Sequence, residues 1–178
     1  EQLSLGKSAI AENRSSDAVR HYSLALLLQD SGFEGLDASE LRQSPEIGLR
    51  RAQVLDEVVG LTKSTRQLYR SEQFESAAAK FREALALDGY SDEAEKGLID
   101  TEVAIKEYEF ASIMSEGYRL LEAGKSSEAV GKFRMAGELG INANEAEIAV
   151  VQTENAIASS DIKRLRVDAE IAAQQELW

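Results

Sequence analysis

The feature that most constrains the fold of this chain is an internal repeat with a period of 52 residues. Shifted by that length, residues 62–105 and 114–157 share 14 identities, well above chance. The matches include Lys80-Phe81-Arg82 with Lys132-Phe133-Arg134. A repeat of this length predicts supersecondary units that bury their apolar faces by packing against their neighbours.

A weaker first copy of the repeat precedes these two. With a shift of 59 residues, Ala18, Tyr22, Ala25, Leu26 and Leu28 align with Ala77, Phe81, Ala84, Leu85 and Leu87. The longer shift places seven additional residues between Gln29 and Ser44. That stretch contains Gly32, Gly35, Asp37 and Ser39, which predict a loop.

The apolar spacing within each copy is helical, and no segment alternates with a period of two. We expect helices at about residues 2–12, 16–29, 46–71, 74–87, 92–122, 127–139 and 144–175. Ser44-Pro45-Glu46 has the N-cap and first-turn residues of a helix start, whereas Asp88-Gly89 and Gly140 predict helix ends. The sequence therefore predicts an all-α chain of about seven antiparallel helices, a single α-solenoid domain over residues 1–178.

Three segments resemble the tetratricopeptide repeat family: residues 6–28, 68–88 and 117–139. The matches fall on that family's packing positions, such as Tyr69, Phe74, Ala77, Phe81, Ala84 and Leu87 in the second segment and Gly117, Leu121, Gly124, Ala129, Phe133, Ala136 and Leu139 in the third. The resemblance implies repeat units at about 2–29, 62–88 and 114–140. The family's period is about 34 residues, so we expect the linking helices 46–71, 92–122 and 144–175 to be prolonged.

The same resemblance implies a binding groove, because the first helix of each family repeat faces a concave surface. Carried over by position, the groove residues are Thr62, Arg66, Tyr69, Arg70, Met114, Tyr118 and Leu121. Basic residues gather on the third expected helix, and Arg and Tyr are enriched at binding anchors. We therefore expect a protein or peptide partner. The Lys/Asn constellation with which some family members clamp a terminal carboxylate is not reproduced.

Candidate enzymatic motifs do not develop into a catalytic site. Gly124-Lys125-Ser126 ends like a phosphate-binding loop but lacks the earlier glycine and a preceding strand. His21 is the only histidine, and the chain has no cysteine, so the ordinary zinc ligand sets are missing. The sequence predicts a protein without catalytic activity, metal or cofactor.

The net charge of −12 opposes binding to nucleic acid, and no apolar run is long enough to insert into a membrane. The compartment stays open between the cytoplasm and the extracytoplasmic part of an anchored protein. Two further functions also stay open. One is an architectural or oligomerisation segment of a larger, membrane-anchored bacterial protein, and the other is the regulatory arm of an enzyme.

The last expected helix has more apolar surface than packing within the chain would cover. One stripe consists of Ala158, Ile162, Leu165, Ala169 and Ala172, and another face carries Val167, Ile171 and Trp178. We expect a partner helix or a second copy of the chain to cover this surface. Self-association is assigned to Val167, Ile171 and Trp178.

Overall fold

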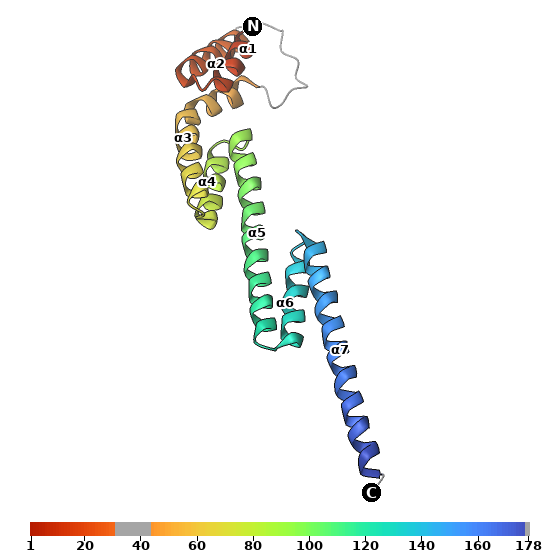
Figure 1. Ribbon diagram of the computed structural model, residues 1–178. Helices are drawn as coiled ribbons and strands as arrows, with labels where there is room; N and C mark the ends of the chain where they lie inside the picture. The colour runs from red at the N-terminus through yellow and green to blue at the C-terminus, as the bar shows by residue number, and fades with distance from the viewer. Residues whose placement is uncertain (31–43, 177–178) are drawn as a thin grey trace. The chain divides into compact units, whose positions relative to one another are not determined.

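The computed structural model describes residues 1–30 and 44–176, and every regular element in that part of the chain is an α-helix (Figure 1). The prediction of an all-α fold with seven helices is confirmed for the described residues. The helices are α1 (Gln2–Ala11), α2 (Ser15–Asp30), α3 (Pro45–Arg70), α4 (Phe74–Leu87), α5 (Asp92–Glu122), α6 (Ser126–Glu138) and α7 (Ala143–Glu176). Most of the loop expected between Gln29 and Ser44 lies outside the described residues.

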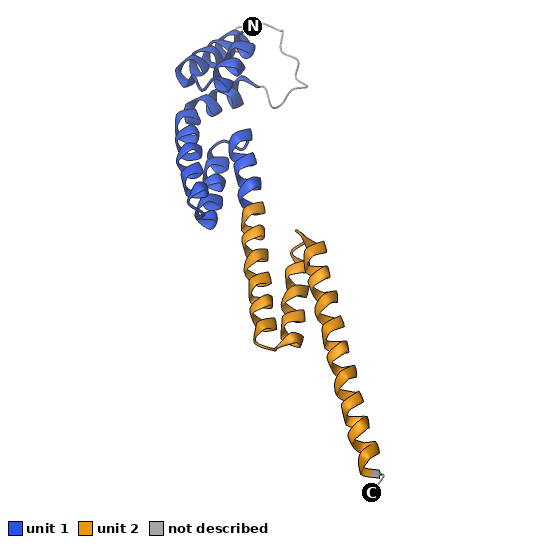
Figure 2. Ribbon diagram, viewed as in Figure 1, with its two compact units in different colours: residues 1–102 blue, residues 103–178 orange. Residues whose placement is uncertain are grey.

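The chain divides into two compact units, residues 1–102 and 103–178 (Figure 2). The first unit contains α1 to α4 and the beginning of α5. The second contains the rest of α5, together with α6 and α7. The assignment of the whole chain to one domain stays a prediction.

The helix ends follow the local signals in the sequence. At the start of α3, Pro45 takes the first helical position and the Ser44 hydroxyl accepts a hydrogen bond from the Ile47 N–H at 3.3 Å. The helix α5 runs for 31 residues without interruption. It covers the range in which the sequence predicts one long helix, residues 92–122.

The turns of the three hairpins α1–α2, α3–α4 and α5–α6 share one backbone conformation. Their left-handed residues are Asn13, Glu72 and Gly124, with φ of 55°, 58° and 75°. In each turn the following N–H donates to the carbonyl oxygen five residues earlier: Arg14 to Ala9 (2.8 Å), Gln73 to Leu68 (3.0 Å) and Lys125 to Leu120 (2.9 Å). This arrangement ends the first helix of each hairpin and reverses the chain.

One buried aromatic ring occupies the centre of the second helix of each hairpin. Tyr22, Phe81 and Phe133 are 4%, 2% and 0% exposed. Each ring packs against a helix at a position that has no side chain: Gly6 and Gly48 around Tyr22, Gly97 against Phe81 and Gly117 against Phe133. A Cβ atom at any of these glycines would come too close to the ring, so the close approach depends on glycine.

Polar contacts repeat with the same period as the aromatic rings. Arg82 pairs with Glu102 at 2.8 Å in the first unit, and Arg134 pairs with Glu154 at 2.6 Å in the second. The buried Thr101 and Thr153 hydroxyls donate to the carbonyl oxygens of Gly97 and Ala149, at 2.6 and 2.7 Å. The 52-residue repeat is therefore a repeat of three-dimensional contacts within each unit.

The first unit has an additional buried ion pair at the end of α4. The Arg51 Nε donates to both carboxylate oxygens of Asp88 at 3.0 Å, and the Arg51 Nη2 donates to the Tyr90 carbonyl oxygen at 3.0 Å. The Asp88 side chain is 5% exposed. Burial raises the pKa of the neighbouring Tyr22 phenol, and the positive charge of Arg51 acts in the opposite direction.

Candidate binding groove in the first unit

The first unit contains a cavity of about 300 Å³ between the end of α3, the middle of α4 and the beginning of α5. We call this cavity the α3–α5 groove. Its lining residues are Arg66, Tyr69, Phe81, Glu93, Lys96, Gly97 and Asp100.

The apolar part of the groove is formed by Phe81 and Gly97. The Phe81 ring lies against the α5 backbone at Gly97, where no side chain separates the two helices. In the second unit the positions equivalent to Phe81 and Gly97 are Phe133 and Ala149. At Gly97 the Phe81 ring therefore approaches the α5 backbone more closely than an alanine would allow.

The polar part of the groove contains charges of both signs. Arg66 on α3 pairs with Glu93 on α5 at 2.6 Å, with side chains 58% and 38% exposed. Lys96 and Asp100 add one charge of each sign, so these four lining residues are neutral in sum although the chain carries −12. A pair this exposed contributes little to stability, about 0–1 kcal/mol, so a partner could replace one member at small cost.

Tyr69 forms one edge of the groove and is 36% exposed. Its ring packs edge-on against Phe74, with ring centroids 5.4 Å apart and an interplanar angle of 66°. This contact holds the phenol at the groove while leaving part of the ring open to a partner.

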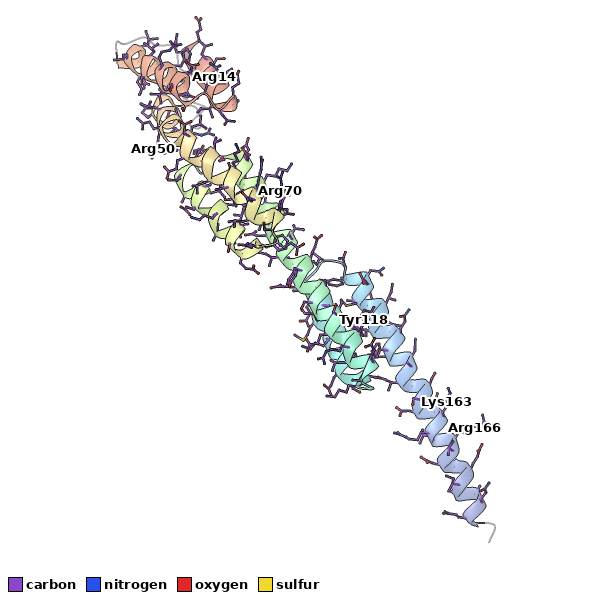
Figure 3. All side chains as sticks on the ribbon, turned by 60° about the vertical axis from the view of Figure 1, so that its left-hand side comes forward. Arg14, Arg50, Arg70, Tyr118, Lys163 and Arg166 are labelled. Carbon is purple, nitrogen blue, oxygen red and sulfur yellow. The ribbon has the colours of Figure 1, made fainter. Side chains whose placement is uncertain are left out.

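The structure places the predicted groove residues of the first unit in different environments. Arg66 and Tyr69 line the cavity. Arg70 is exposed in the last turn of α3, where Figure 3 labels it. The assignment of Thr62 to the groove is wrong, because Thr62 is 1% exposed and its hydroxyl donates to the Val58 carbonyl oxygen at 3.0 Å.

The predicted groove residues of the second unit also differ from one another. Met114 is 4% exposed and belongs to the core cluster around Phe133, so its assignment to a groove is wrong. Leu121 is half-buried against the same cluster. Tyr118, labelled in Figure 3, is 47% exposed. The centroid of its ring lies 5.0 Å from that of the Phe133 ring.

A second cavity, of about 550 Å³, lies between the end of α5 and α6. Its lining includes Glu116, Arg119, Lys125, Glu128 and Lys132. Lys132 bonds to Glu116 at 2.7 Å and thereby lowers the pKa of that carboxyl. Lys125 pairs with Glu128 at 3.1 Å, so these basic side chains are engaged within the unit.

The sequence interpretation missed the α5 side of the groove. None of Glu93, Lys96, Gly97 and Asp100 is among the predicted groove residues. The difference between Gly97 and Ala149 is a sequence signal for the close contact between Phe81 and α5.

Other candidate residues do not converge on a reactive site. In the described part of the chain, no three His, Asp or Glu side chains are grouped as a metal site requires. Gly124-Lys125-Ser126 forms the α5–α6 turn. Val167 and Ile171 are 53% and 49% exposed on α7, and Trp178 lies outside the described residues.

Comparisons with known proteins give no match to this chain, whether with family models, curated proteins or solved structures. Within residues 1–30 and 44–176, each helix is too short or too polar to cross a bilayer.

Proposed function

We propose that the chain is a non-enzymatic, tetratricopeptide-like interaction module that binds a peptide segment of a partner protein in the α3–α5 groove. The observation that carries the proposal is a cavity with the buried Phe81 ring at its base and the exposed Arg66, Glu93 and Tyr69 at its rim. Peptide sites commonly pair an apolar surface with a few directional polar groups.

The groove favours a segment with one apolar side chain and a neighbouring carboxylate. The apolar side chain would contact Phe81 and Tyr69, and the carboxylate would exchange with Glu93 as the partner of the Arg66 guanidinium. Arg66 and Tyr69 belong to the residue types that dominate binding energy at interfaces.

The proposal is tested by selecting a random-peptide display library against the full chain and titrating the enriched peptides. We expect Arg66→Glu combined with Tyr69→Ala to weaken binding by about tenfold or more, equivalent to about 1.4 kcal/mol. A matched control is Arg134→Glu combined with Tyr118→Ala, which changes the same residue types in the second unit. Peptides that bind both variants as tightly as the parent chain would contradict the proposal.

A further inference from the structure

The C-terminal half of α7, residues 158–175, extends past α6, and no other described helix of its own unit covers it (Figures 1 and 3). All of its residues except the half-buried Asp161 are exposed. They include Ile162 and Leu165, which are 67% and 62% exposed.

The exposed stripe continues the register of the repeat. The stripe consists of Ile162, Leu165, Ala169 and Ala172. A shift of 52 residues aligns it with Phe110, Ile113, Gly117 and Leu120 of α5. A second shift of 52 residues aligns it with Val58, Leu61, Thr65 and Leu68 of α3. In both earlier copies these are buried or half-buried positions. Phe110 belongs to the same core cluster as Phe133 of α6, and the Phe133 ring packs against Gly117. Val58 belongs to the same core cluster as Phe81 of α4.

The other apolar face of α7 has a different relation to the earlier copies. Val167 and Ile171 correspond to Ser115 and Arg119 of α5, which are exposed. The repeat therefore distinguishes a helix-binding face, containing Ile162 and Leu165, from a solvent face that contains Val167.

A charged contact of the hairpin has an equivalent on α7 as well. Glu116 of α5 pairs with Lys132 of α6 at 2.7 Å, and the position equivalent to Glu116 is Asp168. An incoming helix with a basic residue directly before its central aromatic ring could repeat this pair.

We propose that residues 158–175 are the first helix of a further hairpin and bind an antiparallel amphipathic helix of another protein. The binding face of that helix has the pattern of α4 and α6, with Phe flanked by Ala four residues before it and three residues after it. The α4 and α6 helices of a second copy already pack within their own units, so they are not available to fill this role.

The charges of α7 indicate that the partner helix carries acidic residues. Lys163 and Arg164 lie where α5 carries the exposed Ala111 and Ser112. Arg166 lies where α5 carries the buried Met114, so it belongs to the helix-binding face, and an acidic residue of the partner helix would face it. Arg164 and Arg166 pair with Asp161 and Glu170 at 3.1 and 3.4 Å, in exposed contacts that a stronger partner can replace. Figure 3 shows Lys163 and Arg166 on this stretch. The inference does not depend on the α3–α5 groove.

The first experiment grafts residues 124–141 after Gln175, in place of residues 176–178, which reproduces the register in which they follow Ala123. We expect amide hydrogen exchange over residues 158–174 to slow by about tenfold or more. Leu165→Asp in the graft should abolish this protection, whereas the matched Val167→Asp should leave it in place. Unchanged exchange in the graft would overturn the assignment of the face.

The second experiment identifies the source of the helix. The parent chain is titrated with a synthetic peptide of residues 124–141 carrying Arg134→Glu, and we expect protection of residues 158–174 that Leu165→Asp removes. Absence of protection by the peptide, when the graft is protected, would overturn binding of a separate helix. Dimerisation of the parent chain in sedimentation, abolished by Leu165→Asp, would assign the face to a second copy of the chain. That result would also overturn the proposal that a helix of another protein binds there.

Discussion

In the first unit Phe81 lies beneath an open cavity bordered by Arg66 and Glu93, whereas in the second unit the ring of Tyr118 lies against the equivalent Phe133. Tyr118 occupies the sequence position of Arg66. Two copies with the same core packing positions therefore carry a groove with charged side chains in one unit and an exposed aromatic ring in the other. Core positions are shared by the two copies, whereas the adjacent exposed positions differ between them.

The two units also differ at the C-terminal ends of α4 and α6, the second helices of their equivalent hairpins. In the first unit the chain after α4 is held by the buried pair between Asp88 and Arg51. In the second unit the position equivalent to Asp88 is Gly140, which adopts a left-handed φ of 74°. One turn depends on a charged side-chain contact, and the other depends on backbone freedom.

The largest expected effect is the loss of the shared aromatic core. We expect Phe81→Ala and Phe133→Ala each to lower the free energy of unfolding by about 3–5 kcal/mol, because each leaves a cavity at a fully packed site. Chemical denaturation monitored by circular dichroism measures the change. Met135→Ala, at a 50% exposed position, is the control and should have an effect within about 0.5 kcal/mol. A loss below 1 kcal/mol at only one phenylalanine would break the equivalence of the two copies.

A smaller effect is expected from Asp88→Asn, which removes the charge from the buried pair of the first unit. The substitution should lower the free energy of unfolding by about 2–3 kcal/mol, because Arg51 loses its charged acceptor. Asp100→Asn, on the exposed rim of the groove, is the matched control. Equal midpoints of urea unfolding for the two variants would show that the turn does not depend on the pair.

The substitution Gly97→Ala gives the first copy the residue of the second. We expect a loss of about 1–3 kcal/mol in the free energy of unfolding, because the new Cβ meets the Phe81 ring. The reciprocal Ala149→Gly should cost about 1 kcal/mol through greater backbone freedom in the helix. Stabilisation by Gly97→Ala would show that the Phe81 ring has room to move.

The smallest expected effect concerns the hairpin turns and has opposite signs in the two units. Glu72→Gly should raise the free energy of unfolding by about 0.5–1 kcal/mol, because a side chain disfavours the left-handed conformation. Gly124→Glu should lower it by about 1 kcal/mol for the same reason. Thermal unfolding of both variants provides the test, and a shift of the same sign in both would be inconsistent with a common turn geometry.

Much of the helical frame could be predicted because its signals are local. The Ser44-Pro45 start, the turn at Gly124 and the repeated Ala–Phe–Ala spacing each act within a few residues. The cavity could not be predicted in the same way, because its lining depends on contacts between side chains of α3 and α5, which α4 separates in the sequence. Glu93 pairs with Arg66, 27 positions earlier in the chain, and no local pattern in either helix indicates that contact.

The helical spacing of α3 and α5 explains why Thr62 and Met114 do not line a groove. Thr62 lies four residues after Val58 and three before Thr65, so all three occupy the same helical face. That face is buried against the core, and the shift of 52 residues carries the same argument to Met114. Position within a family repeat predicts both residues in the groove, whereas the periodicity of each helix places them in the core.

The central claim is that the copies are one packing unit used repeatedly, and the most direct measurement is an exchange of their second helices. Replacing residues 126–139 with the sequence of residues 74–87 keeps the shared Ala, Lys, Phe, Arg, Ala and Leu positions in register. We expect the variant to retain its helical circular dichroism and to unfold cooperatively in guanidinium at a midpoint no lower than that of the parent. Inserting the same sequence one residue out of register should abolish cooperative unfolding. Loss of cooperativity in the in-register variant, or equal behaviour of both variants, would contradict the account.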